Sequence, residues 1–194
     1  MSEHYFDSTP TSEDQRQQVT VSIWGRTSTF TTSTGVFSRE GLDKATDVLL
    51  RHSSPPSAGT VLDLGCGWGA IACGLAGAGA TVWAVDVNER ALELTAANAA
   101  ALGVDVRTAA PDDVPDDLVL DQIWSIPPIR IGKAALHDLL LRWLPRLAPD
   151  GSARLVVGKN LGADSLQRWL GEQGWPTERV ASEKGFRVLV VRRP

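Results

Sequence analysis

From residue 60 onward, short aliphatic runs alternate with longer segments that are rich in Ala and Leu. The short runs are typical of strands buried on both faces, and the longer segments carry apolar residues at helical spacing. This alternation predicts βαβ units that build a parallel sheet. We expect strands at residues 60–64, 81–85, 103–107, 119–125, 153–157, 177–182 and 186–192, and helices at residues 68–78, 89–101, 133–146 and 163–173.

The stretch before the sheet follows a different pattern. Val19, Val21 and Ile23 alternate with polar residues, which is typical of a strand with one buried face. Gly25-Arg26 then has the composition of a turn, and residues 27–32 are rich in β-formers. Together these features predict a β-hairpin.

A helix and a break follow the expected hairpin. Apolar residues at helical spacing over residues 40–51, preceded by Ser38, predict a capped amphipathic helix. Ser and Pro residues at 53–57 then interrupt the chain. We therefore expect an N-terminal extension at residues 1–54, packed on a core domain at residues 55–194.

The last two expected strands are separated only by Glu183-Lys184-Gly185, which predicts a hairpin and hence an antiparallel edge on an otherwise parallel sheet. The predicted fold class is α/β: a Rossmann-like, doubly wound, seven-stranded sheet with an antiparallel last strand, plus the N-terminal β-hairpin and helix.

Composition narrows the class of protein. The chain has 194 residues, of which 43% are hydrophobic, and no apolar run approaches the ~20 residues that a membrane span needs. Because residues 1–4 lack the basic start and apolar core of a secretory signal, we expect a water-soluble, cytoplasmic protein without a membrane partner. Cys66 and Cys73 are expected to be buried thiols without a disulfide or a metal. Nothing in the sequence predicts the oligomeric state.

Charge is unevenly distributed along the chain. The net charge is −4, yet residues 127–194 hold 12 Lys and Arg against 6 Asp and Glu, whereas residues 1–126 hold 7 against 17. Such asymmetry is consistent with a polyanionic partner for the C-terminal part, and equally with an unevenly charged solvated surface.

A glycine-rich loop carries the first chemistry. The apolar strand ends in Asp63-Leu64 and leads through Gly65-Cys66-Gly67-Trp68-Gly69 into a helix. Glycines let the backbone turn and approach a ligand, and the helix N-terminus offers unpaired N–H groups. The next strand ends in Asp86, which is placed to accept hydrogen bonds from both hydroxyls of a ribose. Loop and acid together predict a nucleoside-containing cofactor.

Two cofactors fit this pattern. Gly65, Gly67 and Ala70 satisfy the dinucleotide fingerprint, and Asp86 is correctly spaced for NAD. Asp63, however, would repel a pyrophosphate, whereas it suits the methionine ammonium of S-adenosylmethionine, directly or through water. The antiparallel last strand favours the same cofactor. The residues therefore favour S-adenosylmethionine over NAD.

At this point the sequence resembles the small-domain methyltransferase family, whose members include bacterial ribosomal RNA guanine-N2 methyltransferases. The resemblance covers almost the whole chain and rests on several motifs in the same order. These are His4-Tyr5-Phe6, Gly35-Val36-Phe37-Ser38, the loop from Asp63 to Gly69, Asp86-Val87-Asn88, the segment from Ile126 to Lys133, and the segment from Lys184 to Leu189.

The resemblance implies a set of cofactor contacts. It implies that Phe37 and Ser38 lie over the cofactor, that the glycine loop holds its methionine end and that Asp86 holds its ribose. From the residues alone, Phe37 is as well explained by packing at a helix start. Asp112 is the candidate for the adenine amino group, because the usual acid after the third strand is replaced by Ala109-Ala110-Pro111. The cofactor-binding residues expected are Phe37, Ser38, Asp63, Gly65, Cys66, Gly67, Asp86, Val87 and Asp112.

The segment Ile126-Pro127-Pro128 follows the fourth strand, at the edge where open α/β sheets bind ligands. Related amino-methyltransferases carry Asn-Pro-Pro here, and the resemblance implies that the Asn oxygen and the first Pro carbonyl accept hydrogen bonds from the target amine. Ile126 cannot accept one. We take Ile126, Pro127 and Pro128 as the catalytic loop and expect slow transfer to an amine.

The resemblance implies methyl transfer to an exocyclic amine of RNA, most simply guanine N2 in ribosomal RNA. Methylation of a small molecule and a weakly active or inactive cofactor-binding module remain as alternatives. Arg130 and Lys133 are the expected substrate contacts, with Lys159 and Arg187 as further candidates for phosphate. His137 is explained better by a structural role than by a base.

Overall fold

The computed structural model describes residues 12–194, so the His4-Tyr5-Phe6 motif lies outside the described residues. A two-stranded hairpin consists of β1 (Arg16–Ile23) and β2 (Arg26–Ser33). The main strands are β3 (Thr60–Leu64), β4 (Thr81–Val85), β5 (Val106–Ala109), β6 (Leu120–Ser125), β7 (Leu147–Gly158), β8 (Thr177–Glu183) and β9 (Phe186–Arg192). The helices are α1 (Lys44–Arg51), α2 (Ala70–Ala78), α3 (Glu89–Leu102), α4 (Lys133–Trp143) and α5 (Ala163–Glu172).

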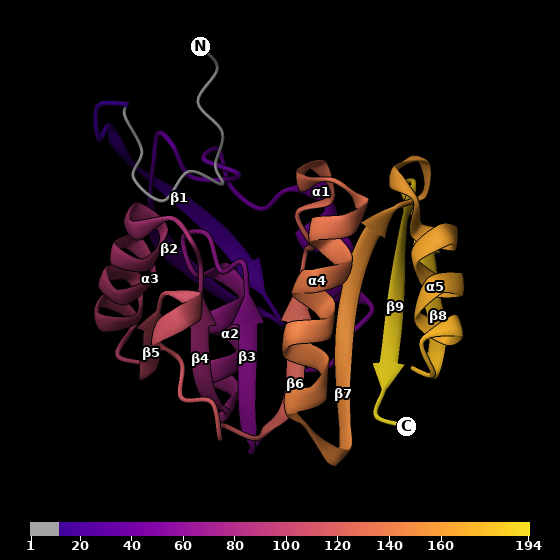
Figure 1. Ribbon diagram of the computed structural model, residues 1–194. Coiled ribbons are helices and arrows are strands. Elements are labelled where there is room, and N and C mark those ends of the chain that lie inside the picture. Colours follow the sequence, from indigo (N-terminus) through magenta and orange to yellow (C-terminus); the bar gives the residue numbers. More distant parts are fainter. Residues whose placement is uncertain (1–11) are drawn as a thin grey trace.

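The seven main strands form one sheet in the order β5-β4-β3-β6-β7-β9-β8 (Figure 1). The first five strands in this order are parallel, and β9 is antiparallel to both of its neighbours. The predicted doubly wound sheet with an antiparallel last strand is thus confirmed. The predicted hairpin of the last two strands is confirmed too: β8 and β9 are antiparallel and form the edge of the sheet, with β9 between β7 and the outermost strand β8.

Helices cover both faces of the sheet. One core cluster joins one face to α1, α2, α3 and the hairpin, and a second joins the opposite face to α4 and α5 (Figure 1). Successive strand residues alternate between the two clusters, as the pleat requires. In β3, Val61 belongs to the first cluster and Leu62 to the second.

The hairpin is fastened to the core by the side chain of Asn98 on α3. This buried amide accepts a hydrogen bond from the Thr31 N–H at 2.7 Å and donates to the Thr31 carbonyl at 2.9 Å. It also donates to the Trp68 carbonyl of the glycine-rich loop at 2.8 Å. One side chain therefore holds β2, α3 and the loop in a fixed arrangement.

The helix expected after Ser38 begins later than predicted. Its N-cap is Asp43, whose side chain accepts hydrogen bonds from the Ala45 and Thr46 amides. Ser38 has φ of 60° and lies in a turn, and Gly41 has φ of 133°, a conformation that no helix accommodates. The segment before Asp43 is therefore a loop, and Ser38 is not the cap.

Three other boundaries also differ. The strand predicted at 103–107 corresponds to β5, which starts only at Val106. Gly103, with φ of 66°, ends α3, and the residues between Gly103 and Val106 connect the helix to the strand. The helix expected to reach residue 146 ends at Trp143, because Pro145 forces a 3₁₀ turn at Leu144–Arg146. The strand expected at 153–157 starts at Leu147, which pairs with Leu120.

Within residues 12–194, no helix combines the length and apolar character that a membrane crossing requires. Cys66 and Cys73 are both free and buried.

We expect Asn98→Ala to lower the free energy of unfolding by about 2 to 4 kcal/mol, because three hydrogen bonds disappear and their buried partners are left unsatisfied. Asn160→Ala, at an exposed position, is the matched control and should change stability by less than about 0.5 kcal/mol. Urea denaturation measures both values. Equal stability of the two variants would contradict this role for Asn98.

Candidate cofactor and substrate site

A cavity of about 540 Å³ opens at the carboxyl ends of the parallel strands. Leu64 at the end of β3, Val85 at the end of β4 and Val157 in β7 contribute to its wall. Asp43 and Lys44, at the start of α1, form part of another side. This is the edge at which open α/β sheets bind ligands, and it includes the point between β3 and β6 where the strand order reverses.

The glycine-rich loop forms one wall of the cavity. Gly65 and Gly67 line it and have φ of 83° and 55°, a left-handed conformation that glycine adopts without strain. The Gly65 N–H donates to the Val85 carbonyl at 2.8 Å, which ties the loop to the neighbouring strand. The loop therefore presents bare backbone toward the cavity.

Asp86 follows β4, and its carboxylate faces both the loop and the next helix. One oxygen accepts from the Gly67 N–H at 3.0 Å and the other accepts from the Asn88 N–H at 3.0 Å. Burial raises the pKa of Asp86, while these backbone hydrogen bonds oppose the rise. The carboxylate and Val87, whose side chain is exposed, both line the cavity, where a ribose would find its acceptor.

Asp63 is placed differently from the expected ligand contact. Only 1% of its surface is exposed, and its carboxylate accepts from the Ala72 N–H of α2 at 2.9 Å. The other oxygen is buried and has no hydrogen-bond partner among the described residues. Burial raises the pKa of Asp63 to about 7, with a smaller contribution from the negative charge of Asp86. Asp63 does not line the cavity, and its ligand role stays a prediction.

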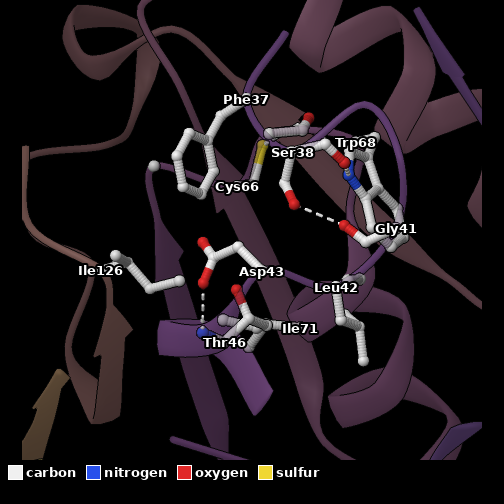
Figure 2. A pocket seen from close by; sticks show the side chains of 13 residues that line it. Phe37, Ser38, Gly41, Leu42, Asp43, Thr46, Cys66, Trp68, Ile71 and Ile126 are labelled. Carbon is white, nitrogen blue, oxygen red and sulfur yellow. Dashed lines mark hydrogen bonds between the residues drawn. The ribbon is translucent and has the colours of Figure 1, made fainter. Parts of the chain in front are cut away.

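A smaller pocket adjoins the cavity and is shown in Figure 2. Phe37, Ser38 and Cys66 line it, and Phe37 also lines the larger cavity. The Ser38 hydroxyl donates to the Gly41 carbonyl, and the Ser38 carbonyl accepts from the Trp68 indole N–H at 3.1 Å. Burial raises the pKa of the Cys66 thiol, which accepts a hydrogen bond from the Thr95 hydroxyl at 3.4 Å.

The Ile126-Pro127-Pro128 loop also lines the cavity. It lies beside the glycine loop, because Leu64 and Ser125, the residues that precede the two loops, are paired in the sheet. The Pro127 carbonyl, the acceptor that the resemblance implies, already accepts from the Ile129 N–H at 2.8 Å and keeps one lone pair for a second donor. The neighbouring Ser125 hydroxyl is buried and donates to the Leu64 carbonyl at 2.7 Å. Ser125 therefore does not replace the acceptor that Ile126 lacks.

Asp112 lies outside this arrangement. It belongs to a 3₁₀ turn at Pro111–Asp113, is exposed, and pairs with Arg142 at 2.9 Å. Its neighbour Pro111 lines the cavity, but Asp112 does not. The expected contact of Asp112 with adenine stays a prediction.

The cationic candidates separate into two groups. Arg130, Lys133 and Lys159 are exposed, and Arg130 also lines the cavity. Arg187 is buried and paired with Asp164, so it is not available as a surface contact for phosphate. His137 stacks on Trp169, with ring centroids 3.5 Å apart, and does not line the cavity.

Asp43 is a residue of the site that the sequence reasoning did not identify. It lines both the cavity and the smaller pocket. The sequence offers only a general N-cap signal for Asp43, namely an acid just before an amphipathic segment. The sequence analysis assigned that role to Ser38 instead. Only the observed start of α1 places this carboxylate beside the glycine loop.

These features define a class of protein: a Rossmann-like domain in which the glycine-rich loop after β3 and Asp86, the acid after β4, line one cavity. The family model of the methyltransferase small domain matches residues 27–190. The chain belongs to this family.

Two relatives are similar to this chain in sequence. YbxB of Bacillus subtilis (strain 168), described as uncharacterized, is 31% identical over 200 residues, which cover 100% of both chains. The ribosomal RNA small subunit methyltransferase C of Idiomarina loihiensis is 32% identical over 154 residues, covering 77% of this chain and 46% of the relative.

A solved structure of similar fold is that of the T. thermophilus 16S rRNA N2 G1207 methyltransferase in complex with AdoMet and guanosine. It superimposes with a TM-score of 0.81 at 23% identity, covering 92% of this chain and 51% of that one. The chain thus spans about half the length of these two methyltransferases, and the whole of YbxB.

The burial of Asp63 makes stability depend on pH. With its pKa at about 7 in the folded protein and ~3.9 in the unfolded chain, Asp63 takes up a proton on folding between these pH values. Its contribution to stability is therefore complete below pH ~4 and is lost as the pH rises to about 7.

Asp63→Asn removes this titration. Between pH 5 and 8, we expect the stability of Asp63→Asn relative to the wild type to rise by about 2 kcal/mol. Urea denaturation at several pH values measures the difference, and Asp113→Asn, at an exposed carboxylate, is the matched control. A flat profile for Asp63→Asn would refute the assignment.

Proposed function

We propose that this chain is an S-adenosylmethionine-dependent methyltransferase that acts on an exocyclic amine of ribosomal RNA, with guanine N2 as the expected target. The observation that carries the proposal is the single cavity shared by the glycine loop, Asp86 and the Pro127-Pro128 loop. A nucleoside-binding wall and a loop of the amino-methyltransferase type thus line the same space.

The cavity suits the proposed cofactor in shape and charge. Its volume of about 540 Å³ lies in the range of small-molecule sites, ~300 to 1,000 Å³. Asp86 would accept hydrogen bonds from the ribose, while Gly65 and Gly67 would let the methionine end lie against backbone. When bound, S-adenosylmethionine supplies a methyl group on a positively charged sulfur, which is already reactive. The residues of the chain need only align the acceptor and exclude water.

The Pro127-Pro128 loop would orient the target. The free lone pair of the Pro127 carbonyl is the fixed acceptor that the resemblance leaves for an amine, since the Ile126 side chain has no polar atom. The amine is therefore held by one acceptor in place of two, and transfer is expected to be slow.

The charge beside this loop supports RNA over a small molecule. Arg130 and Lys133 are exposed and are in no ion pair within residues 12–194. Cations in such positions contact phosphate without reading sequence. A small-molecule methyltransferase remains the second candidate, and binding without turnover is the third.

The experiment that tests the proposal incubates the chain with labelled S-adenosylmethionine and ribosomal RNA from cells that lack this protein. Label should appear in the small-subunit RNA, and digestion should release N2-methylguanosine. The function is refuted if neither the wild type nor the Ile126→Asn variant described next labels ribosomal RNA.

We expect Ile126→Asn to raise the rate of methyl transfer, because it restores a preorganised acceptor of a kind that is commonly worth about 10²- to 10³-fold. Affinity for S-adenosylhomocysteine should not change. Ile131→Asn places the same amide on the exposed part of the loop and is the control. Robust turnover of the wild type, unchanged by Ile126→Asn, would show that the site works without the amide.

We expect Arg130→Gln with Lys133→Gln to weaken RNA binding and to reduce the slope of log affinity against log salt by about 1.5 to 2, because two phosphate contacts are lost. Cofactor affinity should stay the same. The same double substitution at Arg168 and Arg179, which lie on α5 and β8, serves as the control. An unchanged slope would show that Arg130 and Lys133 are ordinary solvated side chains that do not contact the RNA phosphates.

A further inference from the structure

One oxygen of the Asp43 carboxylate is hydrogen-bonded, and the other has no hydrogen-bond partner among the described residues. Its Oδ1 accepts hydrogen bonds from the amides of Ala45 and Thr46, the latter at 2.9 Å, and so caps α1. Its Oδ2 is buried and has no hydrogen-bond partner among the described residues. A buried acceptor of this kind costs stability unless something else satisfies it.

Capping does not explain why this residue is an acid. Ser, Thr and Asn cap helices as well as Asp does, and none of them buries a second charged oxygen. Burial raises the pKa of Asp43, so the folded chain disfavours its ionised form, although the backbone hydrogen bonds of the cap oppose this. The idle oxygen therefore points to a ligand that donates hydrogen bonds to it.

The position of Asp43 indicates which ligand that is. The side chain lines both the cavity and the smaller pocket, together with Gly65 of the glycine loop and with Ile126 (Figure 2). Phe37, Ile71 and Ile126 make the surroundings largely apolar, so a positive charge placed there interacts strongly with the carboxylate. No cation within residues 12–194 forms an ion pair with Asp43.

Asp63, the acid first expected at this place, does not compete for the same ligand. Asp63 extends from β3 toward α2, where it accepts from the Ala72 N–H, and it does not line the cavity. Lys44 follows Asp43 and lines the cavity with it. An acid and a base side by side match the two charges of an α-amino acid.

We propose that Asp43 binds the α-ammonium group of the cofactor's methionine end, through its Oδ2 atom. This inference rests on the cofactor of the proposed function. It moves the contact that discriminates against a pyrophosphate from Asp63 to Asp43, because the carboxylate that faces the ligand is the one that attracts an ammonium and repels a phosphate. Lys44 is the side chain available to the methionine carboxylate.

The test measures binding by calorimetry with two ligands that differ in the methionine end. S-adenosylhomocysteine keeps the ammonium but lacks the sulfonium charge, and 5′-methylthioadenosine lacks the whole amino acid. Asp43→Asn keeps the cap and the shape of the side chain, and Asp43→Ser keeps the cap alone. Glu40→Gln removes one negative charge from an exposed position three residues earlier and is the matched control.

We expect both Asp43 variants to bind S-adenosylhomocysteine about 10- to 100-fold more weakly than the wild type, the loss typical of a hydrogen bond to a charged group. Their affinity for 5′-methylthioadenosine should match that of the wild type, and Glu40→Gln should bind both ligands normally. Thermal unfolding of the variants near the wild-type temperature accompanies this result.

Three results would overturn the proposal. The first is an Asp43→Asn variant that binds S-adenosylhomocysteine as tightly as the wild type. The second is an equal loss for both ligands, which would make Asp43 a structural residue. The third is normal binding with slower methyl transfer, which would assign the idle oxygen to the target amine. If the wild type itself fails to bind S-adenosylhomocysteine, the cofactor of the proposed function fails as well, and the outcomes are thus distinguishable.

Discussion

The hydrogen bond from the Gly67 amide to the Asp86 carboxylate is the contact on which the site depends. It joins the loop after β3 to the residue after β4, so the carboxyl ends of two parallel strands are held as one unit. Together with the Gly65 amide on the Val85 carbonyl, it fixes the left-handed glycine conformations and the start of α2. The cavity keeps its shape because this loop cannot move independently of the sheet.

The same loop explains the concentration of buried acid at this edge. Asp43, Asp63 and Asp86 lie around it, and burial raises the pKa of each. Backbone amides donate hydrogen bonds to all three carboxylates, but within residues 12–194 no Lys or Arg forms an ion pair with them. Burying carboxylates in this way lowers the stability of the fold, and ligand binding can offset that loss. Buried carboxylates with raised pKa values are typical of functional sites. The negative potential of the region suits a ligand that carries positive charge.

The sequence predicted the parts of this molecule that follow from periodicity and local chemistry. The strand with Val61 and Leu62 was recognisable because both faces are apolar, and the loop through Gly65 and Gly67 because few other residues adopt its backbone conformation. Asp86 was found from its place at a strand end. These features are local, so a short window of residues contains the information.

The features that depend on tertiary contacts were not predicted from the sequence. The choice between Ser38 and Asp43 as the cap is decided by the Gly41 turn, and no periodicity reports it. That Asp63 faces α2, and that Arg187 is buried against Asp164, follows from packing between distant segments.

The position of β9 has a consequence for the order of assembly. β8 joins the sheet only through β9, which follows β8 in the chain and lies between β7 and β8. While the chain emerges from the ribosome, β7 therefore has an open edge and β8 has no partner. The N-terminal half, with the glycine loop and Asp86, contains its own strand partners and can fold first. Closure of the sheet, and with it the Phe186 wall of the cavity, waits until β9 is available.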